Sequence, residues 1–236
     1  MRLAAALLLA LAITASAASA AAGAGAGAES QPISEAETAL FMTDYLAALP
    51  VPSALRYGLV RRGTLEPGFS DTVQLDLKPA AGAARSVETR CLSGSRKLEM
   101  PELDFAQGNP ALLCFFERDI REMERLTGGR SAYFRKRIRV ALAGSAQVRP
   151  ATFSYNGHPV AGTEIRIAPY EDDPLRGRYE RYAGKVYLFR MSNEVPGGLI
   201  EATALIPAGS AAQPADVPLL EEALTLAGSQ SPDPTR

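Results

Sequence analysis

Apolar and polar residues alternate along two early stretches of the chain, residues 54–62 and 71–78. Alternation of this kind is typical of a β-strand with one face buried and one face in water. The connection between the stretches contains Gly63, Pro67 and Gly68, which predicts a hairpin with a longer loop. The inward positions are occupied by Leu55, Tyr57, Leu59, Val73, Leu75 and Leu77.

A period of three to four residues follows in the middle of the chain and predicts two helices. The first helix opens at Asn109-Pro110 and closes at Gly128-Gly129, which are typical start and stop signals. Its apolar stripe consists of Leu112, Leu113, Phe116, Ile120, Met123 and Leu126, and its other side of Glu117, Arg118, Arg121, Glu122 and Arg125. The second helix starts after Ser131 and extends to about Leu142, with Phe134, Ile138 and Leu142 on one side.

The last third of the sequence returns to alternation. Residues 147–155 and 159–168 flank Asn156-Gly157, a strong hairpin signal. Residues 185–191 form another strand, and Pro196-Gly197-Gly198 turns the chain into a strand at 199–206.

Three further elements are expected nearer the N-terminus. Ser34-Glu35-Ala36-Glu37 is a capping box that starts a helix, and Pro50 and Pro52 end that helix. A third strand is expected near residues 86–92 and a fourth near residues 96–100.

These elements predict an α+β fold with a curved antiparallel sheet of about seven to eight strands and helices packed on one face. The inward side chains would form an apolar wall beneath the helices, which is a candidate surface for a hydrophobic ligand. The residues expected to line it are Leu55, Tyr57, Leu75, Leu77, Ile165, Ile167, Tyr187 and Phe189.

The N-terminus has the order of parts of a secretory signal peptide. Arg2 precedes an apolar run from Leu3 to Ile13, which is too short to span a bilayer, and two Ala-x-Ala cleavage frames follow between residues 15 and 20. We therefore expect a signal peptide at residues 1–20, a flexible leader at 21–32 and a single domain at 33–207 in the periplasm. Residues 208–236 are expected to form a mostly disordered tail with a short helical patch from Pro218 to Leu226. No transmembrane segment is expected once the signal is removed.

Charge and cysteine content narrow the function classes. The chain has 25 Lys and Arg against 26 Asp and Glu, so losing Arg2 with the signal gives 24 against 26, a net charge of −2. This balance argues against a nucleic-acid binder that relies on bulk charge. The two cysteines, Cys91 and Cys114, are a candidate disulfide in an oxidising compartment, and two separate buried thiols are the alternative.

No familiar catalytic or metal motif is present in the sequence. His158 is the single histidine, lies next to the Asn156-Gly157 turn and has no Gly-x-Ser-x-Gly motif to accompany it. The acidic run 171–173 does not match a calcium-loop spacing, and we expect a solvated turn there. We therefore expect no cofactor, no metal and no assigned catalytic residue.

The densest cationic feature follows Arg130. On the second central helix, Arg135, Lys136 and Arg139 would share a side away from Phe134 and Ile138. This stripe is a candidate site for an acidic envelope partner or for lipid headgroups in peripheral contact with a membrane. A solvated helix face is the alternative.

The element order resembles the periplasmic lipoprotein-carrier (LolA-like) superfamily, in which a curved half-barrel sheet wraps helices around an apolar cleft. The stretches YFRKRIRVAL, APYEDDPLRGRYERYAGKVYLF and SNEVPGG resemble a group of exported proteobacterial proteins without an assigned role. The first resemblance implies a carrier of a lipid or lipoprotein.

Three hypotheses follow. The first is a non-enzymatic periplasmic binding or carrier domain for a lipidic or hydrophobic ligand. The second is an envelope interaction or assembly factor that docks a protein partner through the basic stripe or the acidic turn. The third is an enzyme of an unrecognised type, which would need a pocket with converging acidic groups of perturbed pKa.

Overall fold

The computed structural model describes residues 32–104, 106–209 and 217–230 of the chain. The predicted signal peptide, most of the leader and parts of the tail lie outside these ranges. Among the described helices, none combines the length and the apolar character that a membrane crossing requires.

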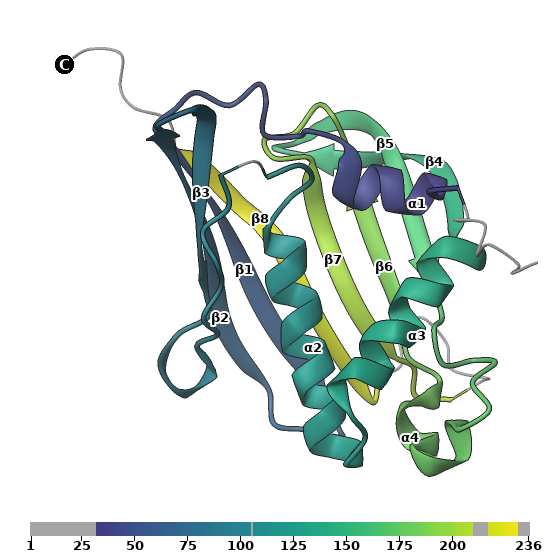
Figure 1. Cartoon of the computed structure of the whole chain (residues 1–236). Coiled ribbons are helices and arrows are strands. Elements are labelled where there is room, and N and C mark those ends of the chain that lie inside the picture. The colour runs from purple at the N-terminus through teal and green to yellow at the C-terminus, as the bar shows by residue number, and fades with distance from the viewer. Residues whose placement is uncertain (1–31, 105, 210–216, 231–236) are drawn as a thin grey trace, which may run out of the picture. The chain divides into compact units, whose positions relative to one another are not determined.

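Eight strands form one antiparallel sheet in the order β3-β2-β1-β8-β7-β6-β5-β4. Figure 1 shows that the sheet is curved. The strands are β1 (Ser53–Gly63), β2 (Phe69–Ala80), β3 (Ala83–Cys91), β4 (Gln147–Tyr155), β5 (His158–Ile167), β6 (Val186–Met191), β7 (Leu199–Ile206) and β8 (Leu220–Gln230).

The two long helices, α2 (Ala111–Thr127) and α3 (Ser131–Gly144), lie across the same face of the sheet (Figure 1). A short helix α1 (Glu35–Glu37) continues into the π-helical turn η1 (Thr38–Met42). Helix α4 (Glu180–Ala183) lies in the connection between β5 and β6, after the 3₁₀ turn η3 (Arg176–Arg178), and another 3₁₀ turn, η2 (Gly94–Arg96), follows β3.

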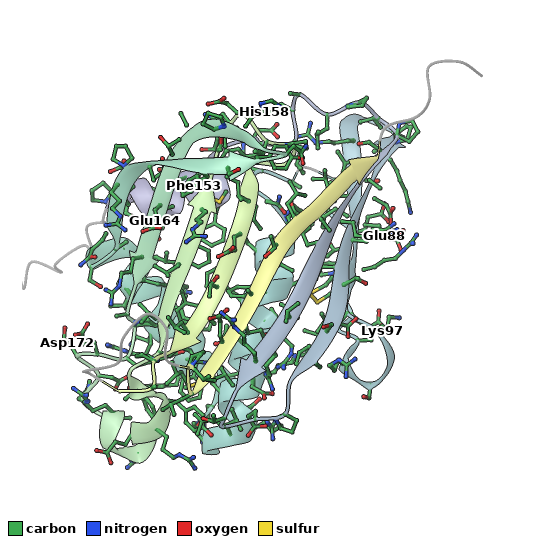
Figure 2. The ribbon with its side chains drawn as sticks, turned by 180° about the vertical axis from the view of Figure 1, so that it is seen from behind. Glu88, Lys97, Phe153, His158, Glu164 and Asp172 are labelled. Atoms are coloured by element: carbon green, nitrogen blue, oxygen red, sulfur yellow. A yellow bond between two sulfur atoms is a disulfide. The ribbon has the colours of Figure 1, made fainter. Side chains whose placement is uncertain are left out.

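The core lies between the sheet and the helices. Leu55, Tyr57 and Leu59 of β1 are buried on the covered face, and the residues between them are exposed or half-buried. Seen from behind in Figure 2, α1, α2 and α3 lie beyond the sheet, and the face toward the viewer carries charged side chains such as Glu88 and Glu164. One apolar and one polar face are what the alternation predicts for a sheet covered on a single side. The predicted α+β class, strand number and helix placement are therefore confirmed.

The capping box and the Asn156-Gly157 turn form as predicted. The Ser34 hydroxyl accepts a hydrogen bond from the Glu37 N–H, and the Glu37 carboxylate accepts one from the Ser34 N–H. Asn156 and Gly157 both have positive φ, as the tight hairpin turn between β4 and β5 requires.

The C-terminal segment corrects one prediction. Residues 220–226 of the expected helical patch at 218–226 belong instead to β8, which pairs with β1 on one side and β7 on the other. The domain boundary at residue 207 therefore falls too early. Leu, Glu and Ala favour a helix in isolation, but pairing along both edges of this segment outweighs that preference.

Three smaller predictions are also wrong. Residues 96–100 form no strand, because only Leu98 pairs there, in a single bridge with Cys91. The first helix ends at Met42 instead of continuing toward Pro50, because Thr43 already has extended backbone. Leu113, assigned to the inward stripe of the first central helix, is 38% exposed, and Phe115 is buried instead.

Candidate functional site

The predicted apolar wall exists, but it is enclosed. Each of its eight side chains is at most 1% exposed, and all belong to one core cluster. Phe116 of α2 packs on Phe189 with ring centroids 5.4 Å apart, and Phe115 meets the edge of Tyr187 at 6.4 Å. A ligand could therefore reach these residues only if a helix moved away from the sheet. Their role in ligand binding stays a prediction.

Helix α2 is attached to the sheet by a covalent bond. Cys114 of α2 and Cys91 of β3 form a disulfide across a sequence separation of 23 residues. The cross-link ties the first turn of the helix to an edge strand of the sheet, and a loop of this length contributes about 3 kcal/mol of stability.

A buried lysine also connects α2 to the sheet. Lys185 is fully buried, and its Nζ donates to Asp119 Oδ1 of α2 at 2.7 Å. The Tyr187 hydroxyl donates to the other carboxylate oxygen of Asp119 at 2.5 Å. Burial and the neighbouring Asp119 charge raise the pKa of Tyr187 well above its usual value, so the phenol stays a hydrogen-bond donor.

A second buried charge cluster lies farther along α2. Arg61 of β1 bridges Glu122 of α2 at 2.8 Å and Glu222 of β8 at 2.9 Å, and Arg118 contacts the same two carboxylates. Burial opposes ionisation of Glu122, but the hydrogen bond from Arg125 and the charges of Arg118 and Arg61 lower its pKa to about 2. Paired charges hold α2 in one position because moving it would leave each of them unpaired.

The prediction that Arg118 and Glu122 lie on the outer side of this helix is wrong, because both are buried. A signal for the cluster was nevertheless present. Arg61 lies two residues after the inward-facing Leu59, and Glu222 lies two residues from both Leu220 and Leu224. Side chains two residues apart in a strand point to the same face, so both charged side chains point inward.

An open hollow lies where α2 ends and α3 begins, beside the segment that contains η3. Its volume is about 380 Å³. We call it the α2–α3 hollow, and its lining consists of Thr127, Gly128, Gly129, Arg130, Tyr133, Phe134, Leu175, Arg178 and Tyr179. Gly128 ends α2 in the left-handed conformation with φ 67°, which favours glycine.

The floor of the α2–α3 hollow is continuous with the core. Phe134 lines the hollow, yet it is only 1% exposed and belongs to the main core cluster. Its ring packs edge-on against Tyr170 and Tyr179, with centroids 5.9 and 5.7 Å away. The hollow is thus an opening next to the apolar interior beneath α3.

Asp173 joins the two walls of the hollow. Its buried carboxylate accepts a hydrogen bond from the Tyr133 hydroxyl of α3 at 2.5 Å and one from the Leu175 N–H at 2.7 Å. Arg137 of α3 lies 3.0 Å from its other oxygen. Burial opposes ionisation, but the hydrogen bonds from Tyr133 and Leu175 and the charge of Arg137 hold the pKa of Asp173 below its usual value. Asp173 therefore latches α3 to the segment before η3.

The acidic run thus differs from the solvated turn that we expected. Asp173 is 2% exposed, whereas Glu171 and Asp172 are exposed, and Figure 2 shows Asp172 on a loop at the edge of the molecule. The described residues contain no group of three or more His, Cys, Asp or Glu side chains placed to hold a metal ion. His158 is exposed at the tip of the β4–β5 hairpin (Figure 2).

The predicted basic stripe lies on the exposed side of α3, and one member is already paired. Arg135 donates from Nε and Nη2 to the Glu117 carboxylate of α2, at 2.9–3.1 Å. Lys136 and Arg139 are exposed and form no ion pair within the described ranges. Whether the stripe contacts a partner or headgroups stays a prediction.

Solved structures similar to this chain include a mycobacterial lipoprotein and a domain from a Vibrio protein. Lipoprotein LppX of Mycobacterium tuberculosis is 10% identical, with 78% of this chain and 89% of that chain covered and a TM-score of 0.30. A putative outer membrane lipoprotein-sorting protein domain from Vibrio parahaemolyticus is 9% identical, with 75% and 84% covered and a TM-score of 0.21. No protein-family model matches the chain. No curated protein matches it significantly.

Proposed function

We propose that this protein is a non-enzymatic periplasmic binding or carrier domain that takes up a hydrophobic ligand through the α2–α3 hollow. The observation that carries the proposal is the position of Phe134, which belongs to both the open hollow and the closed core. A ligand that enters beside Phe134 would meet aromatic side chains first and the apolar wall of the sheet beyond them.

The hollow alone is too small for a long lipid. Ligand pockets have volumes of about 300–1,000 Å³, and 380 Å³ is near the lower limit. The remaining space would have to come from movement of α3 away from the sheet. The eight predicted wall residues would then become the surface on which the apolar part of the ligand lies.

The structure has one firmly attached helix and one that is more weakly attached. Helix α2 carries the disulfide and both buried charge clusters, whereas the α3 side chains that make long-range polar contacts are half-buried or exposed. These contacts are the Asp173 latch, the hydrogen bond from Arg137 Nε to the Pro169 carbonyl, the exposed Arg135–Glu117 pair and the hydrogen bond from the Ser34 hydroxyl to the Leu142 carbonyl. We therefore assign the movement to α3, with Gly128 and Gly129 as the hinge.

Two leucines provide a matched test of the entry site. Leu175 lines the hollow and is 37% exposed, and Leu113 is 38% exposed on α2 outside the hollow. Leu175→Asp places a charge in the path of an apolar ligand and should weaken binding of the neutral probe 1-N-phenylnaphthylamine at least about tenfold, or roughly 1.4 kcal/mol. Leu113→Asp should leave the affinity unchanged. Fluorescence titration measures both.

The proposal fails if the probe does not bind the wild-type protein. It also fails if both aspartate variants bind the probe equally well. Circular dichroism of each variant, compared with the wild type, establishes that a loss of binding is not a loss of fold.

A further inference from the structure

The mouth of the α2–α3 hollow contains two cationic side chains and no acidic one. Arg130 and Arg178 both line it, and the other lining residues are aromatic, aliphatic, glycine or threonine. The two arginines come from different segments of the chain, since Arg130 precedes α3 and Arg178 ends η3. Both are exposed, and neither forms an ion pair within the part of the chain that the structure describes.

Two acidic groups beside the hollow are already engaged. Asp173 is buried and bound to Arg137, Tyr133 and the Leu175 N–H. Glu124, at the end of α2, accepts hydrogen bonds from the hydroxyl and the N–H of Ser131. By contrast, Arg135 and Arg137 of α3 each have a carboxylate partner. The positive charge at the mouth therefore has no partner from these acids.

From this arrangement we propose that the α2–α3 hollow binds an amphipathic anion, with its phosphate or carboxylate head held between Arg130 and Arg178 and its apolar chain directed past Phe134. A guanidinium group suits both head types, because its planar N–H groups match two oxygens of a phosphate or a carboxylate. The inference rests on the proposed function, because the apolar chain needs the space beneath α3.

The size of the hollow agrees with a ligand whose anionic head is held at the two arginines and whose apolar chain extends beyond the hollow. A volume of about 380 Å³ accommodates a head group and the start of a chain, but not a whole lipid. The aromatic rings of Tyr133 and Tyr179 line the walls, and the Tyr133 hydroxyl is directed to Asp173. The hollow thus combines apolar aromatic surface with two guanidinium groups.

The test compares ligands that share a chain and differ in the head. Decyl phosphate, decanol and inorganic phosphate each compete with 1-N-phenylnaphthylamine for the wild-type protein and for the double variant Arg130→Gln/Arg178→Gln. Arg121→Gln is the matched control, because Arg121 is an exposed arginine on α2 that does not line the hollow.

We expect decyl phosphate to displace the probe from the wild type at a concentration at least about tenfold lower than decanol does. A tenfold ratio corresponds to the contribution of about one charge-assisted hydrogen bond. The double variant should lose this preference while its affinity for the neutral probe and for decanol is kept. Arg121→Gln should behave as the wild type. Inorganic phosphate should not displace the probe.

Three results would overturn the inference. The first is equal displacement by decyl phosphate and decanol in the wild type, and the second is an unchanged preference in the double variant. The third is displacement by inorganic phosphate at the concentration at which decyl phosphate acts, which would make the free anion the ligand. Failure of the neutral probe to bind the wild type would instead reject the proposed function itself.

Discussion

Glu221 and Glu222 are neighbours on β8 that face opposite sides of the sheet. Glu222 is 2% exposed and lies 2.9 Å from Arg61 in the interior, whereas Glu221 pairs with the exposed Arg62 on the open face. The same residue type thus forms a buried ion pair and a surface ion pair at adjacent positions. Removing one partner of a buried pair leaves an uncompensated charge in the interior. Removing one partner of a surface pair leaves a charge that water solvates.

We expect Glu222→Gln to lower the free energy of unfolding by about 3–5 kcal/mol and Glu221→Gln to lower it by less than about 1 kcal/mol. Urea denaturation at neutral pH measures both values. Similar losses in the two variants would show that the Arg61 cluster contributes no more than a surface pair.

Asp173 links the stability of the α3 latch to pH. Because its folded pKa lies below its unfolded value, its contribution is complete above the unfolded pKa of about 3.9 and is lost as the pH falls through the folded pKa. Asp173→Asn should therefore be less stable than the wild type by about 2 kcal/mol at pH 7, and the gap should narrow below about pH 4. Urea midpoints at several pH values measure the gap, and a gap that stays constant down to pH 2 contradicts the latch.

At the scale of elements, β8 has the largest influence on the fold, because it joins two halves of the sheet. It is the only connection in the strand order between β3-β2-β1 and β7-β6-β5-β4 among the described residues. A chain that ends at Pro207, the predicted domain boundary, should fail to fold, whereas a chain that ends at Gln230 should fold. Circular dichroism and thermal melting distinguish the two, and a cooperative melt of the shorter chain would show that β8 is dispensable.

Alternation identified seven of the strands, because β1 to β7 carry apolar residues at every second position or a clear turn signal. It missed β8 because Glu222 occupies an inward position and because Leu220 and Leu224 also fit a helical period. The partner that makes Glu222 suitable for the interior is Arg61, 161 residues away in the sequence. A local sequence pattern cannot show that two residues so far apart in the chain form an ion pair.

Only part of the candidate site could be predicted from the same sequence patterns. The apolar wall followed from alternation, and α3 with its Arg130 start followed from helical period. The α2–α3 hollow did not, since it depends on the segment 173–179 folding back against α3 through Asp173. The sequence of this segment predicts a solvated turn, because a buried aspartate is expected only where its partners are known.

At the scale of the whole molecule, the proposed function requires a fixed helix, α2, and a movable helix, α3, on the covered face of the sheet. Helix α2 is held by the Cys91–Cys114 disulfide and by buried ion pairs. Its partners in these pairs are Arg61 of β1, Glu222 of β8 and Lys185, which directly precedes β6. Helix α3 is held by apolar packing, by the Asp173 latch and by polar contacts with Glu117, Ser34 and Pro169. Ligand uptake therefore should change α3 and the segment beside it while α2 and the sheet stay as they are.

Hydrogen exchange followed by mass spectrometry tests this division most directly. The protein is compared with and without saturating 1-N-phenylnaphthylamine. We predict that amide exchange changes in residues 127–144 and 170–183, which contain α3 and the walls of the α2–α3 hollow, and stays the same in residues 111–123 of α2. Bound probe with altered exchange in α2 and none in α3 would contradict the account.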